Sequence, residues 1–261
     1  MASHSPQGRV PTTHRDALDK LLIGVQRSLL REASMAFGML GDAVELLWTL
    51  DADAAQKLRK RDDRVDAVEV QIEQQCIKII ALQQPMARDL RLISFALRVN
   101  ADFERVADHA CSIAKVAILL DRHGLKPIWP TAFTEMAERV PLISQRLLRA
   151  VVDEDRKLAQ QIIEDDEIID RLHDRVFDET VALMRHEPQT PELGLLIHRA
   201  TRELERVADL MASVAEAVVY LGSGEIVRHS KRLARAAAVL EAAQKGVGRD
   251  SLRPQDGDSA S

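Results

Sequence analysis

The chain has 261 residues, of which 46% are hydrophobic, 30% charged and 3% aromatic, and its formal net charge is −5 at pH 7. This balance is typical of a globular protein. It excludes the broad basic surface by which nucleic-acid-binding proteins hold phosphate groups. The few aromatic residues and only 11 glycines, set against abundant alanine, leucine, arginine and glutamate, favour an all-α fold over a β-rich one.

The sequence contains neither the apolar run of a signal peptide near its start nor a stretch of about 18 apolar residues that could cross a bilayer. We therefore expect a cytoplasmic protein that reaches a membrane only through its partners. Cys76 and Cys111 do not show the spacing of zinc ligands. They are expected to be small core residues of a reduced protein.

The first half of the chain predicts three helices after a polar, flexible segment at 1–14. Apolar residues recur at helical spacing, and Asp51 is a candidate N-cap. Pro85 is expected in the first turn of the third helix, where proline is tolerated. One glycine and two prolines then mark a linker at 123–130. The first helix is predicted over 15–50 and the third over 85–122. The second is predicted to run from the cap at Asp51–Asp53 to residue 84.

The second half repeats this pattern, with helices predicted over about 131–152, 155–186 and 192–221. The six helices predict two tandem three-helix bundles, at 15–123 and 124–230. A short helical extension and a disordered tail rich in Gly, Pro, Asp and Ser are expected at 231–261.

An internal repeat supports the two-bundle prediction. The pentapeptide Glu-Arg-Val-Ala-Asp at 104–108 recurs letter for letter at 205–209, which is 101 positions later. The acidic segments at 62–66 and 166–170 also correspond, at an offset of 104. The repeat therefore indicates that one antiparallel helical bundle is built twice, once in each half of the chain.

Each half carries two pairs of acidic residues spaced four apart, so that both members of a pair lie on one helix face. Counted from the turn between their helices, Asp66 and Glu104 lie at nearly the same distance, roughly 27–29 Å at 1.5 Å per residue. The pairs of one half can therefore face each other across a helix–helix seam. The eight residues are Asp62, Asp66, Glu104, Asp108, Asp166, Asp170, Glu205 and Asp209.

Four converging carboxylates suit a hard cation such as Mg²⁺, Mn²⁺ or iron rather than a thiol-seeking metal. Solvated helix faces, or ancestry without present function, are the simpler explanations of such pairs. Asp170 and His173 resemble half of the carboxylate-x-x-His motif of ferritin-like di-iron enzymes, but the aligned residue of the first half is Glu69. His109 is expected to point away from the metal ligands, and His198 to be structural.

Several segments, in this order and spacing, resemble the PhoU family of bacterial phosphate-signalling regulators. They cover about 15–229. The segments are Arg61-Asp62-Asp63-Arg64-Val65-Asp66, the run Gln84-Pro85-Met86-Ala87-Arg88-Asp89-Leu90-Arg91, both Glu-Arg-Val-Ala-Asp motifs, and Tyr220-Leu221-Gly222-Ser223-Gly224-Glu225-Ile226-Val227-Arg228-His229.

The resemblance implies two PhoU-type bundles in a protein that is often a homodimer and is not an enzyme. It implies metal binding by the eight acidic residues, with iron, manganese, magnesium or zinc as the candidate ions. It also implies repression of the phosphate-starvation response, through the ATPase of the phosphate ABC transporter and a sensor histidine kinase. The segment after Asp209 is apolar, so the cluster around Glu104 is expected to bind metal more readily. A metal-free structural adaptor and a ferritin-like carboxylate-metal enzyme are the alternatives.

Overall fold

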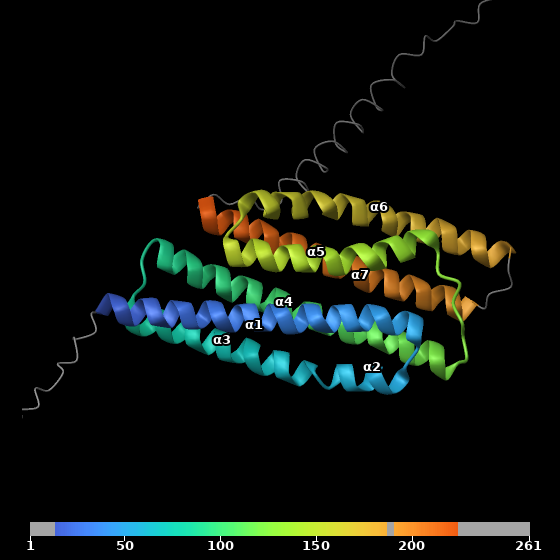
Figure 1. Ribbon diagram of the computed structural model, residues 1–261, viewed down its shortest axis with the longest axis horizontal. Helices are drawn as coiled ribbons and strands as arrows, with labels where there is room; N and C mark the ends of the chain where they lie inside the picture. The colour runs from blue at the N-terminus through green and yellow to red at the C-terminus, as the bar shows by residue number, and fades with distance from the viewer. Residues whose placement is uncertain (1–13, 187–190, 224–261) are drawn as a thin grey trace, which may run out of the picture. The chain divides into compact units, whose positions relative to one another are not determined.

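The computed structural model describes residues 14–186 and 191–223, and every regular element within them is an α-helix. The prediction of an all-α fold is therefore confirmed, while the expectations for 1–13 and 224–261 lie outside the described residues. In chain order the helices are α1 (His14–Thr49), α2 (Ala52–Arg59), α3 (Asp62–Gln83), α4 (Arg88–Arg122), α5 (Thr131–Asp153), α6 (Arg156–His186) and α7 (Pro191–Ser223) (Figure 1).

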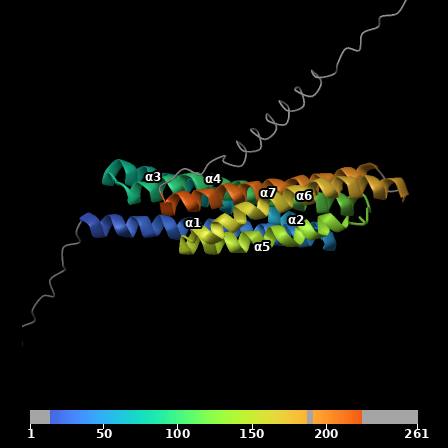
Figure 2. The same ribbon diagram turned by 90° about the horizontal axis from the view of Figure 1, so that it is seen from above.

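The described helices pack in two groups that correspond to the two halves of the repeat. In the first group α1, α2 and α3 all contact α4, and in the second α5, α6 and α7 contact one another. The groups meet where α4 packs along α7 and α1 contacts α5, and the helices run lengthwise beside one another (Figures 1 and 2). The described residues of both halves belong to one compact unit. A domain boundary at 123/124 stays a prediction.

The predicted second helix is not continuous, and that prediction is wrong: α2 and α3 replace it. Asp51 is the N-cap of α2, as predicted, and its carboxylate accepts a hydrogen bond from the Ala54 amide at 2.9 Å. At the break, the Arg61 amide donates to the Leu58 carbonyl at 2.8 Å, a three-residue step that interrupts the α-helical ladder. The Arg61 guanidinium pairs with Asp42 of α1, so a tertiary contact accompanies the break.

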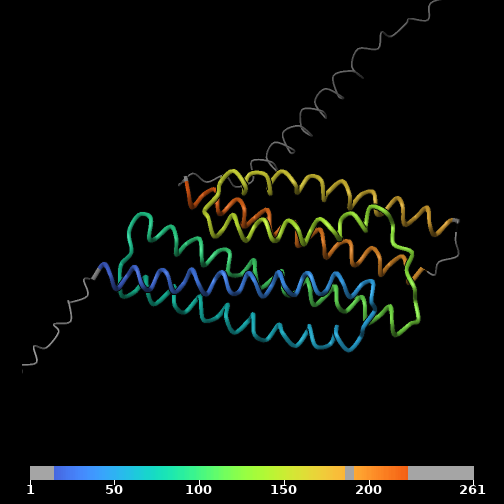
Figure 3. Tube along the Cα trace, in the orientation of Figure 1, coloured from blue at the N-terminus to red at the C-terminus, as the bar shows by residue number. Residues whose placement is uncertain are grey.

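The fourth helix begins at Arg88, so the predicted place of Pro85 in a first helical turn is also wrong. Gln84 ends α3 in the left-handed conformation, with φ 47°, and Ala87 has φ 49°. These two residues reverse the chain direction within a few positions, and the fixed φ of proline fits the turn between them. The Cα trace doubles back here, which makes α3 and α4 antiparallel neighbours (Figure 3).

One continuous apolar core fills the space between the described helices. Phe37 of α1 and Phe103 of α4 meet edge to face, with ring centroids 5.6 Å apart. Cys76 is fully buried, as predicted, and Cys111 packs partly buried against the core. None of the helices in the described part of the chain is long and apolar enough to span a membrane. The acidic residues lie at the edges of this core, where two helices meet.

Candidate metal centres

The first candidate centre lies on the seam between α3 and α4. Asp62 and Asp66 occupy the first turns of α3, and Glu104 and Asp108 lie one turn apart in α4. The pKa of Glu104 is raised to about 7, first by burial and then by the charges of Asp108, Glu69, Asp66 and Asp62. The structure therefore brings the four predicted residues together and adds Glu69 of α3 to them.

Several interactions act on the carboxylate of Asp62 in the first cluster. Its carboxylate lies in the first turn of α3, where the helix dipole favours negative charge. Burial raises its pKa, the charges of Asp108 and Asp66 raise it further, and a hydrogen bond from the Cys111 thiol lowers it. The pKa of Cys111 is itself raised to about 12 by burial and by Asp62. The thiol therefore stays protonated near neutral pH, and the donor set of the cluster is made of oxygen.

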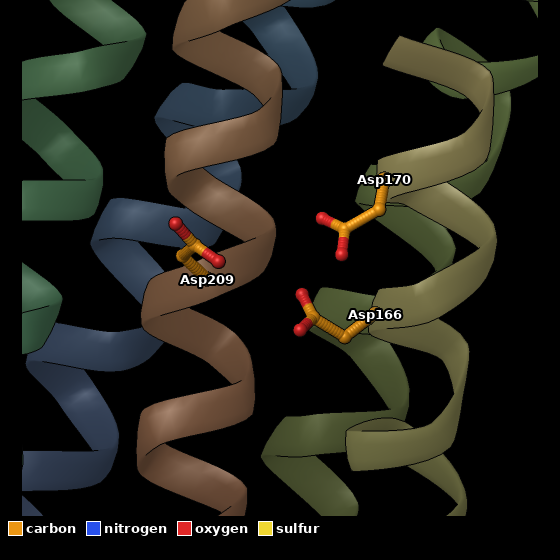
Figure 4. Close-up of side chains that lie close together, drawn as sticks. All are labelled: Asp166, Asp170 and Asp209. Carbon is orange, nitrogen blue, oxygen red and sulfur yellow. The ribbon is translucent and has the colours of Figure 1, made fainter. Parts of the chain in front are cut away.

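The second candidate centre lies on the seam between α6 and α7. Asp166 and Asp170 project from α6 toward Asp209 of α7 (Figure 4). One carboxylate oxygen from each of the three lies within 4.8 Å of the others, and no other acidic, His or Cys group among the described residues meets this spacing. The carboxylates thus converge more tightly in the second half, although the sequence favoured the cluster around Glu104.

Glu205 completes the second cluster. Burial raises its pKa, and so do the charges of Asp209 and Asp170, whereas His173 and Arg206 lower it. Each half therefore assembles four of the eight predicted residues. The second cluster has a histidine and an arginine close enough to Glu205 to offset part of its negative charge.

Both clusters fit a hard cation. Carboxylate oxygens are the ligands that Mg²⁺, Mn²⁺ and iron prefer in proteins. Mutual repulsion makes the ionised state of each cluster costly when no cation is bound. The Oδ1 atom of Asp62 is buried and accepts no hydrogen bond, which leaves an oxygen lone pair available. A bound cation would remove the repulsion and satisfy this oxygen.

The histidines divide between the second cluster and the contact between the two halves. His173 lies close enough to Glu205 to lower its pKa. The ring of His198 lies 6.2 Å from that of His173, and its own pKa is lowered by burial and by the His173 charge. The Nδ1 atom of His109 lies 2.6 Å from Oε2 of Glu203, which links α4 to α7.

Two acidic residues beside the first cluster were not predicted, Glu69 and Glu32. Glu69 follows Asp62 and Asp66 at a spacing of seven and three, so it extends their stripe along α3. Glu32 interrupts the apolar stripe of α1 between Leu29 and Ala36. This interruption of the apolar pattern marks Glu32 in the sequence, but helical periodicity alone does not show which side chains surround it.

Comparison with known proteins gives one consistent family. The sequence matches the PhoU domain twice, over 29–117 and 133–218. A protein from Deinococcus radiodurans, described as a phosphate-specific transport system accessory protein PhoU homolog, is 35% identical over 211 residues, which cover 80% of this chain and 98% of the relative. A Pseudomonas aeruginosa homolog of the same description is 33% identical over 205 residues, 78% of this chain and 85% of the relative.

Solved structures agree with this result. The crystal structure of PhoU from Pseudomonas aeruginosa matches with a TM-score of 0.76 and 32% identity, over 79% of this chain and 99% of that chain. The structure of the phosphate transport system regulatory protein PhoU from Streptococcus pneumoniae matches with a TM-score of 0.74 and 26% identity, over 80% and 99% of the two chains.

Proposed function

The chain belongs to the PhoU family, and from this premise we propose that it is an accessory and regulatory protein of a phosphate-specific transport system. It acts as a metal-binding helical adaptor that represses the phosphate-starvation response when phosphate is plentiful. The observation that carries the proposal is the pair of acidic seams, one in each PhoU-domain match, in a chain whose relatives are described as transport accessory proteins.

The metal part of the proposal assigns four carboxylates to each seam. Iron, manganese, magnesium and zinc are the candidate ions. A bound cation would supply positive charge between two helices and so hold α3 to α4, or α6 to α7. The first seam uses Asp62, Asp66, Glu104 and Asp108, and the second uses Asp166, Asp170, Glu205 and Asp209.

The adaptor part of the proposal concerns partner proteins. The ATPase of the phosphate transporter and a sensor histidine kinase are the proposed partners, reached in the cytoplasm, with a homodimer as the acting form. Leu82, Met86 and Leu90, around the α3–α4 turn, are 64%, 78% and 43% exposed. Exposed apolar side chains that gather in one place are typical of protein-binding surfaces, so this end of the first half supports docking.

A catalytic role is less well supported. Ferritin-like enzymes place a carboxylate-x-x-His motif on each of two helices, whereas here His173 belongs to α6 and the corresponding residue of α3 is Glu69. We therefore propose a protein without enzymatic activity of its own.

The regulatory proposal is tested by deleting this gene together with every other PhoU-family gene of its host. The phosphate-starvation genes should then stay expressed in phosphate-rich medium, and the wild-type gene should restore repression. Affinity-tagged full-length protein should co-purify with the transporter ATPase or the kinase. Normal repression in the deletion strain would contradict the signalling role.

Metal binding is tested separately, by elemental analysis of protein purified without chelator. The Glu104→Ala/Asp108→Ala variant should lose the metal of the first seam, and the Asp170→Ala/Asp209→Ala variant that of the second. The matched control is Glu45→Ala/Asp53→Ala, which removes two exposed carboxylates elsewhere. Equal metal in all four proteins would reject both seams and leave a metal-free adaptor, with the regulatory test unaffected.

A further inference from the structure

Glu32 of α1 is fully buried, and neither of its carboxylate oxygens has a hydrogen-bond partner. The other buried polar residues of the described chain each make a hydrogen bond: Asn100, Ser144, Thr180 and Thr201. An unpartnered buried carboxyl group is costly and calls for a physical explanation, such as a bound water or ion.

The surroundings of Glu32 are acidic. Glu69 of α3 and Glu104 of α4 lie close enough for their charges to raise its pKa, and together with burial, the larger cause, they raise it to about 9. No basic group contributes to this shift. Glu32 is therefore the member of the acidic group that lies deepest in the core, below the seam on which Glu104 and Asp108 lie.

A second orphaned oxygen lies on the same side of the cluster. Asn100 precedes Glu104 by one helical turn, so the two residues lie on one face of α4. Its amide nitrogen donates to the Glu69 carbonyl at 3.0 Å, while its Oδ1 atom is buried and has no partner. Carboxylate and amide oxygens are both ligands of hard cations.

The second half shows that the fold does not need an acid at this position. Met136 of α5 corresponds to Glu32 at the repeat offset of 104 and is also fully buried. A methionine of similar length fills the equivalent space with no polar atom to satisfy. The carboxylate of Glu32 is therefore present for a reason other than packing.

We propose that Glu32 is an additional cation ligand that closes the inner side of the first cluster, together with Glu69 and Glu104. Among the described residues these three carboxylates do not already lie within 4.8 Å of one another, so a hard divalent cation would draw them together and tie α1 to the α3–α4 seam. The second cluster, with Met136 at this position, would hold its cation from α6 and α7 alone. This inference rests on the metal binding proposed above and goes beyond it in assigning a ligand to α1.

Mn²⁺ is a suitable probe, and the full chain carrying Asp166→Asn/Asp170→Asn isolates the first cluster. In this background Glu32→Met introduces the residue that the second half has at the same position. Glu45→Gln removes one exposed carboxylate from the same helix and is the matched control. Bound Mn²⁺ is measured by equilibrium dialysis, and the Tm is measured with Mn²⁺ and with chelator.

Glu32→Met should raise the Tm in chelator, because it removes an unpartnered buried acid. It should also weaken Mn²⁺ binding by roughly 10- to 100-fold and shrink the rise in Tm that Mn²⁺ produces. Glu45→Gln should change neither quantity measurably. The opposite signs of the two effects separate loss of a ligand from damage to the fold.

Mn²⁺ binding that is equal in Glu32→Met and Glu45→Gln but lost in Asp108→Asn would overturn the role of Glu32 and leave the first seam as a metal site. Binding that is absent from all of these proteins, including the parent, would overturn the metal proposal as well. The two failures are therefore distinguishable.

Discussion

The two carboxylate clusters occupy equivalent positions of one repeat, yet their electrostatic surroundings differ. The first also contains Glu69 of α3 and has Glu32 of α1 beside it, whereas the second has His173 and Met136 at the same two positions. His173 and Arg206 lower the pKa of Glu205, whereas the named charges acting on Glu104 are all acidic. The same backbone arrangement therefore holds more acidic residues in the first half, and in the second half it places a histidine and an arginine beside Glu205.

The helix that carries the first acidic pair also differs between the halves. In the first half the chain breaks before Asp62, which places this residue at the start of α3. In the second half α6 runs unbroken through Asp166. The break therefore gives Asp62 the favourable field of a helix N-terminus. Part of the excess negative charge of the first cluster is offset by the backbone itself.

The variant Met136→Glu tests the difference between buried Glu32 and buried Met136, and its expected effect on stability is the largest. It places in the second half the buried acid that the first half carries as Glu32, but with no cation to stabilise it in chelator. We expect the free energy of unfolding to fall by roughly 3 to 5 kcal/mol, the usual cost of an unpaired buried acid. The measurement is chemical denaturation in chelator, with Met136→Leu as the volume-matched control. A loss no larger than that of the control would show that this position tolerates an acid.

The pH dependence of metal-free protein tests the burial of Glu32. Its pKa is about 9 when folded, against an ordinary value of 4.5, so between these values the native state binds a proton that the unfolded state lacks. Stability must then fall as pH rises through this window. Between pH 7 and 8 the expected loss is about 1.4 kcal/mol.

In this pH window Glu32 has the largest expected contribution, and Glu104 adds a smaller loss of the same sign near pH 7. The raised pKa of Glu104 is about 7, the lowered pKa of His198 lies below 6.5, and the thiol of Cys76 has a pKa of about 11. Denaturation in chelator at pH 7 and pH 8 should therefore show a slope in the wild type that Glu32→Met largely removes, with the smaller contribution of Glu104 remaining. An equal slope in both proteins would assign the effect to other groups and contradict the burial argument.

Much of this architecture follows from the sequence. Apolar periodicity predicted an all-α chain with helical segments close to α1, α4, α5, α6 and α7. Counting residues from the connecting turn, together with the offset of 104, paired the acidic residues across each seam. The break before Arg61 was not predictable, because no glycine or proline marks it and its guanidinium pairs with Asp42 on a different helix. Glu32 was missed for a similar reason. Its importance depends on Glu69 and Glu104, which approach it only when three helices have packed.

The smallest expected effect on stability concerns an ion pair that occurs in both halves with the acidic and basic residues in swapped positions. Asp42 pairs with Arg61 between α1 and the start of α3, while Arg146 pairs with Asp165 between α5 and α6. Both members of the second pair lie 104 positions after those of the first. The repeat has therefore kept the contact while reversing its polarity, which indicates that attraction across this gap matters and its direction does not.

Asp42→Arg/Arg61→Asp transfers the polarity of the second half to the first. Each single change should lower the free energy of unfolding by up to about 1 kcal/mol, because like charges then face each other across a partly exposed gap. The double variant should recover most of that loss, with a positive coupling energy in a double-mutant cycle that shrinks at high salt. The cycle is measured by denaturation in chelator, so that metal binding does not enter. Losses that simply add would mean that the pair contributes no attraction. The break before α3 would then depend on Arg61 itself, through the three-residue backbone step from its amide to the Leu58 carbonyl, and not on its partner in α1.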